Sequence, residues 1–348
     1  MLNFITLFDK NYLSRGLALY HSLVEQCGQF ALYIVAMDSE TEEYFKQENM
    51  DNRTIISLKQ IEAFYPELVE IKKERSRAEY CWTLTPYSIQ YAIKKYILES
   101  CIYIDADMFF YSNPKVLLEE AGNNSIIITE HRYTPEYDQA KTSGKYCVQF
   151  MFFKNDANGT EALEWWRQRC KEWCYARFED GRFGDQKYLD DWITRFKGVY
   201  VPRHIGCGIA SWNLQQYDFF TRANKIIVSD EITKEQKELI FAHYHSLKKI
   251  IYFRKNIWYL GDYYFPNRSR EILFIPYIKR LLDIERELKN SLISPAIIKK
   301  TTIPHKQSFI IFFIKNIIKS FFIKRQLDLY KKYIIENANE VSRYLFFD

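Results

Sequence analysis

The chain has 348 residues, enough for one large α/β domain with an appendage. Its net charge of +5 is unevenly distributed, because residues 270–348 contain 15 Lys and Arg against 8 Asp and Glu and so carry +7. The preceding residues carry −2, which argues against a nucleic-acid-binding main domain, because such a domain needs a basic face of its own.

The first third of the chain alternates predicted strands with predicted helices. Apolar, β-prone runs predict strands at residues 3–8, 30–36 and 54–58. The amphipathic segment 17–24 predicts the first helix, and residues 80–100 predict a long one. Strands that alternate with helices predict an α/β fold with a mostly parallel central sheet and helices on both faces.

Two acidic residues follow the next predicted strand. The buried-strand pattern of residues 101–104 ends in Asp105-Ala-Asp107. Ligands of open α/β sheets bind at the carboxyl ends of strands, and carboxylate oxygens suit a hard divalent cation. Such a cation can neutralise the charge on a departing diphosphate. We therefore predict a site for Mn²⁺ or Mg²⁺ at Asp105 and Asp107; the competing interpretation is a loop cap or an ordinary surface acid.

Two more strands are predicted at residues 125–129 and 146–153. The loop between them, residues 131–145, is polar and rich in Tyr, and its length is typical of a lid or an acceptor wall. Gln149 stands alone among apolar neighbours in the second strand, where an amide needs a partner. We predict that Gln149 contacts a donor sugar, with a role in satisfying the backbone as the alternative.

Asp185 and Gln186 begin a predicted helix over residues 186–196. Gly184-Asp185 is also a favourable helix N-cap. Capping and catalysis are compatible here, because a capped helix end is a rigid mount for a side chain. The residues alone leave both roles open for Asp185.

Two histidines and two lysines lie close together near residue 245. His243 and His245 alternate on a strand-like segment, so both point to one face of a sheet. A neutral imidazole is a suitable third metal ligand beside two carboxylates. The residues alone favour neither His243 over His245 as that ligand, nor Lys248 over Lys249 as the lysine that meets a phosphate.

Together these motifs resemble those of the GT-A nucleotide-diphospho-sugar transferases. They are most similar to glycosyltransferase family eight, which includes glycogenin and the lipopolysaccharide galactosyltransferase-like enzymes. The similarity covers about residues 1–255, with four motifs in the family's order. The resemblance implies a nucleoside site at the first strand and the loop after it, formed by Thr6, Phe8, Asp9 and Tyr12.

The other three motifs imply the chemical site. In the family, the first Asp of the Asp-x-Asp motif, here Asp105, binds both the metal and the nucleotide sugar. Asp185 and Gln186 match a motif that lies close to the reacting sugar. The segment from His243 to Lys249 matches a motif that supplies the third metal ligand and a phosphate-binding lysine.

The resemblance implies that the chain moves a sugar from a nucleotide-diphosphate sugar, a UDP-sugar, to a glycan or lipid-linked acceptor in cell-surface polysaccharide synthesis. It also implies retention of the anomeric configuration. An inverting enzyme would need a carboxylate base, which Glu130, Asp190 or Asp191 could supply. The alternative function is a non-catalytic nucleotide-sugar-binding or scaffolding protein of the same fold.

The sequence also departs from the family pattern. Ser246 stands where the family has Gly, and residues 80–83 lack the Arg expected in the helix before the metal motif. We therefore predict a divergent relative of the type found in bacterial polysaccharide loci.

A basic, aromatic-rich helical tail is predicted after the catalytic domain. We place the domain at residues 1–268 and the tail at residues 269–348, with helices at residues 271–290 and 308–325. The second helix is basic and amphipathic, which is typical of a helix that lies on a membrane surface; packing on the catalytic domain is the alternative. The seven cysteines form no CxxC pair, which indicates reduced thiols. We expect a cytoplasmic protein that touches the inner face of the plasma membrane.

Overall fold

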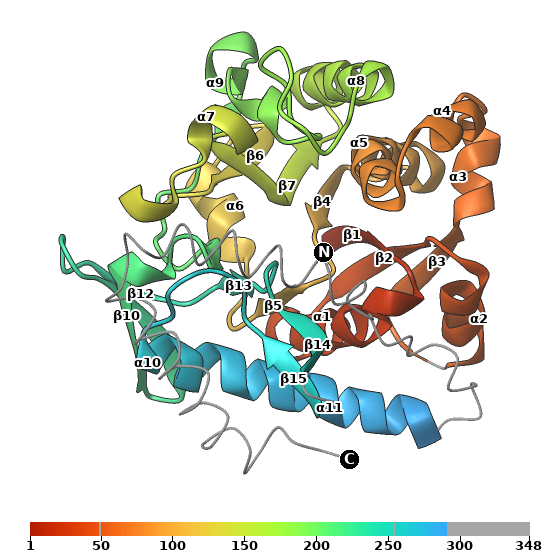
Figure 1. The fold of residues 1–348 in the computed structure, drawn as a ribbon. Helices are drawn as coiled ribbons and strands as arrows, with labels where there is room; N and C mark the ends of the chain where they lie inside the picture. The colour runs from red at the N-terminus through yellow and green to blue at the C-terminus, as the bar shows by residue number, and fades with distance from the viewer. Residues whose placement is uncertain (49, 253–254, 291–348) are drawn as a thin grey trace. The chain divides into compact units, whose positions relative to one another are not determined.

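A seven-stranded sheet forms the centre of the larger of two compact units, the main unit, in the order β3-β2-β1-β4-β7-β6-β8 (Figure 1). The computed structural model describes residues 1–48, 50–252 and 255–290. The strands are β1 (Leu2–Phe8), β2 (Phe30–Ala36), β3 (Arg53–Ser57), β4 (Ser100–Ile104), β6 (Ile126–Glu130), β7 (Tyr146–Lys154) and β8 (Val199–Tyr200). Residues 1–245 and 263–290 belong to one compact unit, and residues 246–262 belong to a second.

The sheet is mostly parallel, as predicted. Strands β3, β2, β1 and β4 run parallel to one another, and β8 runs parallel to β6. Strand β7 is antiparallel to both of its neighbours, β4 and β6. The carboxyl ends of β1, β2, β3 and β4 therefore meet at one edge of the sheet, where Asp105 and Asp107 follow β4.

Helices cover both faces of the sheet (Figure 1). Helices α5 (Arg77–Tyr96) and α8 (Ala157–Glu172) pack together on one face, where Ile5 and Leu7 join the core. Helix α1 (Leu13–Cys27) covers the other face. A Cβ at Gly16 would lie 2.3 Å from the Phe8 ring, so the missing side chain lets α1 approach β1 closely.

Sequence signals explain where α5 begins and ends. Ser76 and Glu79 form a capping box at its start. Ile97 ends it in the left-handed conformation, with φ of 53°. Shorter helices connect the strands: α2 (Ser39–Gln47), α3 (Leu58–Phe64), α4 (Leu68–Glu74), α6 (Lys115–Ala121), α7 (Ala140–Ser143) and α9 (Trp192–Arg195).

The predicted helix at residues 186–196 is not continuous. The structure forms a 3₁₀ turn at Lys187–Leu189 and then the short α9. Asp190 lies between them, and its carboxylate accepts a hydrogen bond from the backbone N–H of Lys145 and pairs with Lys187. These contacts to a distant loop coincide with the break in the helix, and no local sequence signal announces them.

A three-stranded sheet brings distant residues to the end of β4. It consists of β5 (Met108–Phe110), β13 (Phe241–His243) and β9 (Ile209–Ala210). Strand β13 is antiparallel to β5, and His243 lies opposite Met108. A separate sheet contains β10 (Tyr217–Arg222), β11 (Lys225–Asp230) and β12 (Gln236–Glu238). In the second unit, β14 (Lys248–Tyr252) pairs with β15 (Lys255–Tyr259).

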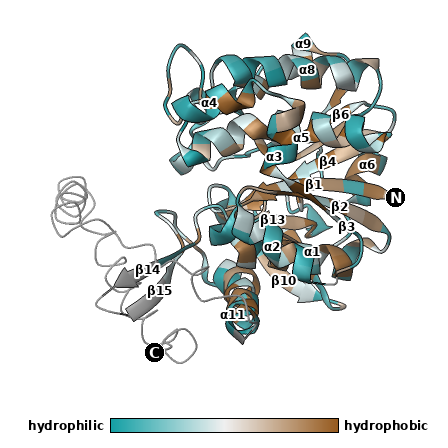
Figure 2. Cartoon of the chain, turned by 90° about the vertical axis from the view of Figure 1, so that its right-hand side faces the viewer, coloured by the Kyte–Doolittle hydropathy of each residue, from teal (hydrophilic) through white to brown (hydrophobic). Residues whose placement is uncertain are grey.

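The helix predicted at residues 271–290 forms and packs on the main unit. It follows α10 (Asn267–Ser269) as a π-helical turn, Arg270–Phe274, and then α11 (Ile275–Asn290). Tyr277 stacks on Tyr244 with 3.7 Å between ring centroids, and α11 is apolar on one side and hydrophilic on the other (Figure 2).

The predicted membrane-binding helix, residues 308–325, lies outside the described part of the chain. The boundary between a catalytic domain and a tail at residue 268 also stays a prediction. None of the helices that the structure describes is long and apolar enough to span a bilayer.

Candidate metal centre and active site

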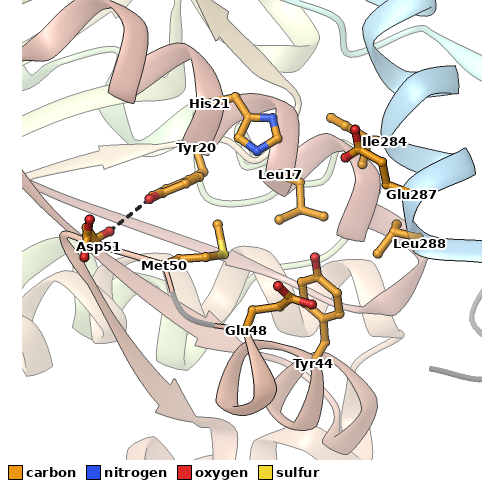
Figure 3. A pocket seen from close by; sticks show the side chains of 10 residues that line it. All are labelled: Leu17, Tyr20, His21, Tyr44, Glu48, Met50, Asp51, Ile284, Glu287 and Leu288. Carbon is orange, nitrogen blue, oxygen red and sulfur yellow. Dashed lines mark hydrogen bonds between the residues drawn. The ribbon is translucent and has the colours of Figure 1, made fainter. Parts of the chain in front are cut away.

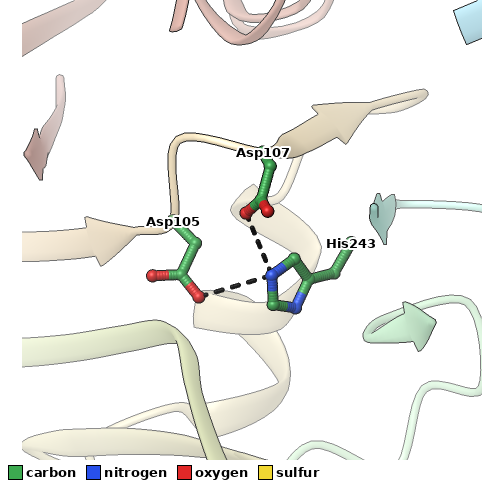
Figure 4. Close-up of side chains that lie close together, drawn as sticks. All are labelled: Asp105, Asp107 and His243. Atoms are coloured by element: carbon green, nitrogen blue, oxygen red, sulfur yellow. Dashed lines mark hydrogen bonds and ion pairs between the residues drawn. The ribbon is translucent and has the colours of Figure 1, made fainter. Parts of the chain in front are cut away.

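Asp105, Asp107 and His243 converge at the carboxyl edge of the sheet (Figure 4). His243 Nε2 lies 3.0 Å from Asp107 Oδ1 and 3.5 Å from Asp105 Oδ2. One ligand atom from each of the three residues lies within 4.8 Å of the others. Across residues 1–290, apart from 49, 253 and 254, no other group of His, Cys, Asp or Glu meets this criterion.

Local structure fixes the two carboxylates. The backbone N–H of Asp105 donates to the Gln149 carbonyl at 3.0 Å, and the Tyr103 hydroxyl donates to Asp105 Oδ1 at 2.8 Å. The chain then turns, with the Met108 N–H donating to the Asp105 carbonyl. This turn directs both aspartates toward β13, where His243 is the last residue.

The charges of Asp105, Asp107 and His243 shift one another's pKa values. Burial alone would raise the pKa of Asp107, but the charge and hydrogen bond of His243 hold it at about 2. Burial raises the pKa of Asp105, with the charge of Asp107 adding to the effect and that of His243 opposing it. Burial lowers the pKa of His243, but the charge and hydrogen bond of Asp107 outweigh it and hold this pKa well above 6.5.

The donor set fits a divalent cation. Two carboxylates and one imidazole are suitable ligands for Mn²⁺. Three protein ligands are fewer than the coordination number of Mg²⁺ or Mn²⁺, so a phosphate of the donor and water could occupy the other positions. The proton that His243 holds without metal would leave as the cation binds, because the ligand form of imidazole is neutral.

The structure also places the second histidine. His245 is exposed, and its ring centroid lies 5.7 Å from that of His243. Trp212 packs edge-on against both imidazoles, at 5.6 Å and 5.7 Å. His243 is therefore the histidine that contacts the two aspartates. His245 lies beside it and is exposed to solvent.

Asp185 lies buried beside the cluster. Its residue is 5% exposed, and its backbone carbonyl accepts a hydrogen bond from Trp166 Nε1 at 2.8 Å. Burial and then the charge of Asp105 raise the pKa of Asp185 to about 8. The preceding Gly184 has φ of +52°, and its Cβ position faces the ring of Trp82.

Gln186, rather than Asp185, occupies the cap position of the 3₁₀ turn, and its side chain makes no cap hydrogen bond. Its amide nitrogen instead donates to the Ser143 carbonyl at 2.7 Å. Asp185 therefore does not cap a helix, contrary to the capping interpretation. The hydrogen bond of Gln186 joins this segment to the loop at residues 139–145.

The predicted nucleoside residues lie at the end of β1. Thr6 and Phe8 are buried in the strand, and the Phe8 ring packs on Phe45. Asp9 accepts a hydrogen bond from the Asn11 N–H at 2.8 Å. The charge of Asp107, followed by burial, raises the pKa of Tyr12 to about 12.

Gln149 is completely buried on β7, next to the cluster. Its Nε2 lies 3.4 Å from Thr129 Oγ1, and its Oε1 has no hydrogen-bond partner in the described chain. A Cβ at Gly208 would come within 2.9 Å of Nε2. The side chain is thus closely confined, and its contact with a sugar stays a prediction.

Lys248 and Lys249 lie at the start of β14, in the second unit. Lys249 Nζ lies 5.6 Å from the centroid of the Trp258 ring, and β14 pairs with β15 through the register Lys248 to Tyr259. A phosphate-binding role for either lysine stays a prediction.

Arg77 contacts the predicted site residue Asp9, and sequence reasoning missed this contact. Arg77 Nε lies 2.5 Å from Asp9 Oδ2, and Arg77 Nη2 lies 3.0 Å from Asp38 Oδ2. Arg77 thereby links the loops that follow β1 and β2. A signal was present, because Ser76 and Glu79 mark a helix start at residue 77, three residues before the predicted one.

The fold of GT-A type that the sequence predicts is confirmed. The strand order, the single antiparallel strand β7 within the main sheet, and the Asp105-Ala-Asp107 turn at the end of β4 have the arrangement expected of it. Asp190, one of the three candidates for an inverting base, pairs with Lys187 at 2.6 Å and accepts a hydrogen bond from the N–H of Lys145, so it anchors a loop.

Comparison with known proteins finds relatives of unassigned function. No family model matches the sequence. The uncharacterized protein YfnD of Bacillus subtilis is 28% identical over 285 residues, covering 80% of this chain and 88% of YfnD. The uncharacterized protein YfnF of the same organism is 30% identical over 253 residues, covering 70% of this chain and 81% of YfnF.

A solved structure is also similar. The galactosyltransferase LgtC in complex with donor and acceptor sugar analogues is 12% identical, with a TM-score of 0.44, covering 70% of this chain and 87% of LgtC. Membership of glycosyltransferase family eight stays a prediction.

Proposed function

The chain belongs to the same protein family as YfnF of Bacillus subtilis, and we propose that it is a metal-dependent glycosyltransferase. It would move a sugar from a nucleotide-diphosphate sugar to a glycan or lipid-linked acceptor. The observation that carries the proposal is the convergence of Asp105, Asp107 and His243 at the carboxyl edge of the sheet, where open α/β folds bind their ligands.

Asp105, Asp107 and His243 would hold Mn²⁺ or Mg²⁺. When bound, the cation supplies positive charge that stabilises the departing nucleoside diphosphate. The surrounding residues keep the three ligands in place: Tyr103 donates to Asp105 and Trp212 packs against His243. Because Asp107 and His243 are buried, Asp105 is half-buried and neighbouring side chains hold them, the site would need little rearrangement to bind the donor.

The nucleoside would lie over the end of β1. Asp9 and Tyr12 project from the loop after this strand, and Tyr12 lies near Asp107. Thr6 and Phe8 are buried within the strand, so they would contribute through the backbone and through packing. A UDP-sugar is the donor that we propose, because the resemblance to family eight implies a uridine nucleotide.

Asp185 and Gln186 would face the reacting sugar. A buried carboxyl whose pKa is about 8 can hold a proton at neutral pH and donate a hydrogen bond to a sugar hydroxyl. Gln149 would contact the donor sugar, and Lys248 or Lys249 would assist departure of the diphosphate. We propose retention of the anomeric configuration, because the resemblance to family eight implies it.

A binding experiment tests the proposal. Thermal unfolding of the full chain would be measured with UDP-, GDP- and CDP-sugars, each with and without Mn²⁺. We expect stabilisation by UDP-sugars that requires Mn²⁺, about 2.7 kcal/mol at one hundred times the dissociation constant.

The Asp107→Asn variant should lose this stabilisation. Asp218→Asn is the matched control, because Asp218 pairs with Arg268 on the surface at 2.7 Å and takes no part in the cluster. Stabilisation that survives in Asp107→Asn, or the absence of metal-linked stabilisation by any donor, would contradict the proposal.

A further inference from the structure

A pocket separate from the metal centre lies between α1, α2 with the segment that follows it, and α11 (Figure 3). Its volume is about 390 Å³, within the range of small-molecule sites. None of its lining residues belongs to the Asp105 cluster, and all of them belong to the main unit. The pocket therefore needs an explanation of its own.

The charges around this pocket are acidic. Glu48, Asp51 and Glu287 line it, and no Lys or Arg does. These three carboxylates form no ion pair with any residue that the structure describes. His21 also lines the pocket, and burial, followed by the charge of Arg280, lowers its pKa below 6.5. The imidazole is therefore neutral at neutral pH and adds no positive charge to the pocket.

Tyr44 indicates where a ligand would bind. The residue is only 7% exposed, and its hydroxyl has no hydrogen-bond partner within the described chain. Figure 3 shows this hydroxyl directed into the pocket, between Leu17 and Leu288. Burial and the negative charges of Glu48 and Glu287 raise the pKa of Tyr44 to about 12. The hydroxyl is not one of the fully buried polar atoms, so it faces the pocket, and a donor group of a ligand would give it a partner there.

The remaining walls are apolar. Leu17 comes from α1, Ile284 and Leu288 come from α11, and Met50 lies across from them (Figure 3). A ligand that fits both kinds of wall has a cationic end and an aliphatic chain. Anions such as phosphates and nucleotides are unsuited to this site, because three unpaired carboxylates repel them.

We propose that this pocket binds an aliphatic amine, with the ammonium group between Glu48, Glu287 and the Tyr44 hydroxyl and the chain along Leu17, Ile284 and Leu288. An ammonium group has three N–H donors, one for each of these acceptors. Aliphatic amines are protonated at neutral pH, as the lysine side chain is. The site is independent of the proposed sugar transfer.

The test is isothermal titration of the full chain with spermidine and with putrescine at neutral pH. We expect saturable binding at one site. The Glu48→Gln and Glu287→Gln variants should each weaken it about tenfold or more, because each removes a charge-assisted hydrogen bond. Tyr44→Phe should weaken it by a smaller factor, since it removes a neutral acceptor.

Asp283→Asn is the matched control. Asp283 lies on the same helix, is exposed and pairs with Arg286, so its loss should leave amine binding unchanged. Asp107→Asn should also leave it unchanged, which separates this site from the metal centre. Circular dichroism would verify that each variant is folded.

Three results would overturn the proposal. The first is no binding of either amine at millimolar concentration. The second is equal binding by the wild type and both Gln variants. The third is Mg²⁺ binding at the same site with equal affinity, since this would indicate a general attraction of cations to acidic residues.

Discussion

His243 and Asp107 form a buried pair whose protonation state governs the metal site. In the metal-free chain the pKa of His243 lies well above 6.5, because the charge of Asp107 outweighs the effect of burial. A cation must displace the proton on His243 before it can bind. Proton and metal therefore compete for the same nitrogen atom.

We predict that Mn²⁺ affinity rises with pH. While one proton is displaced, the affinity should increase by up to about tenfold per pH unit between pH 6 and pH 8. Titration calorimetry at pH 6, 7 and 8 would measure it, in two buffers of different ionisation enthalpy to count the released protons. A dissociation constant that is the same at all three pH values would contradict the prediction.

Asp185 permits a second prediction at the residue scale. Its pKa is raised from 3.8 to about 8, so the folded state binds this proton more tightly than the unfolded state does. The resulting cost to stability is absent below pH 3.8 and grows as the pH rises toward 8. Asp185→Asn should therefore stabilise the chain at pH 7 by about 1 kcal/mol or more.

The same Asp185→Asn variant should lose sugar transfer. We expect activity to fall about 100-fold or more, because an amide cannot exchange the proton that a carboxyl can. Urea denaturation and a donor-hydrolysis or transfer assay would measure the two effects. A variant that is less stable and fully active would indicate a structural role instead.

At the scale of elements, the close packing of α1 on β1 depends on Gly16. A Cβ there would approach three atoms of the Phe8 ring within 2.3–2.7 Å. We predict that Gly16→Ala destabilises the chain by about 1–3 kcal/mol, because the ring must move. Ser14→Ala, one half-turn earlier on the same helix, is the control and should change stability by less than about 0.5 kcal/mol. Urea denaturation would measure both variants.

The start of α5 is joined to the end of β1 by Arg77. We predict that Arg77→Gln raises KM for the donor about tenfold and changes kcat less, because Asp9 loses the charged partner that orients it. Arg268→Gln is the matched control, since Arg268 pairs with Asp218 on the surface. Equal kinetic constants for both variants and the wild type would contradict the role of Arg77.

At the scale of the whole molecule, charge separates the chain into two parts. The +7 of residues 270–348 contrasts with the −2 of the rest. We predict that the full chain sediments with phosphatidylglycerol vesicles at low salt and not with phosphatidylcholine vesicles. The binding should weaken as salt increases, because exposed charges are screened.

Within residues 308–325 the effect should depend on Lys315, Lys319 and Lys324. Replacing all three with Gln should cost about 3 kcal/mol of vesicle affinity. A triple Gln variant at three exposed lysines of the main unit is the control: Lys141, Lys171 and Lys197. Equal loss in both triple variants would indicate non-specific attraction to the surface of the whole chain.

The fold and part of the site follow from local sequence patterns. Buried strands are visible as apolar runs, and the Asp105-Ala-Asp107 turn directly follows one of them. Where the prediction was wrong, the structure has a contact between residues distant in the chain. The break in the predicted helix at residues 186–196 coincides with the contact between Asp190 and the backbone of Lys145, 45 residues away in the chain.

The sequence by itself determined the parallel sheet, the positions of its buried strands and the two aspartates that follow β4, because these depend on the local alternation of apolar and polar residues. The tertiary structure alone decided that His243, rather than His245, meets them, since this depends on the register of β13 against β5. It also decided that Arg77 meets Asp9. Both contacts join residues far apart in the chain, 136 positions for His243 and Asp107, and such pairing is set by packing of the whole fold, which no local pattern encodes.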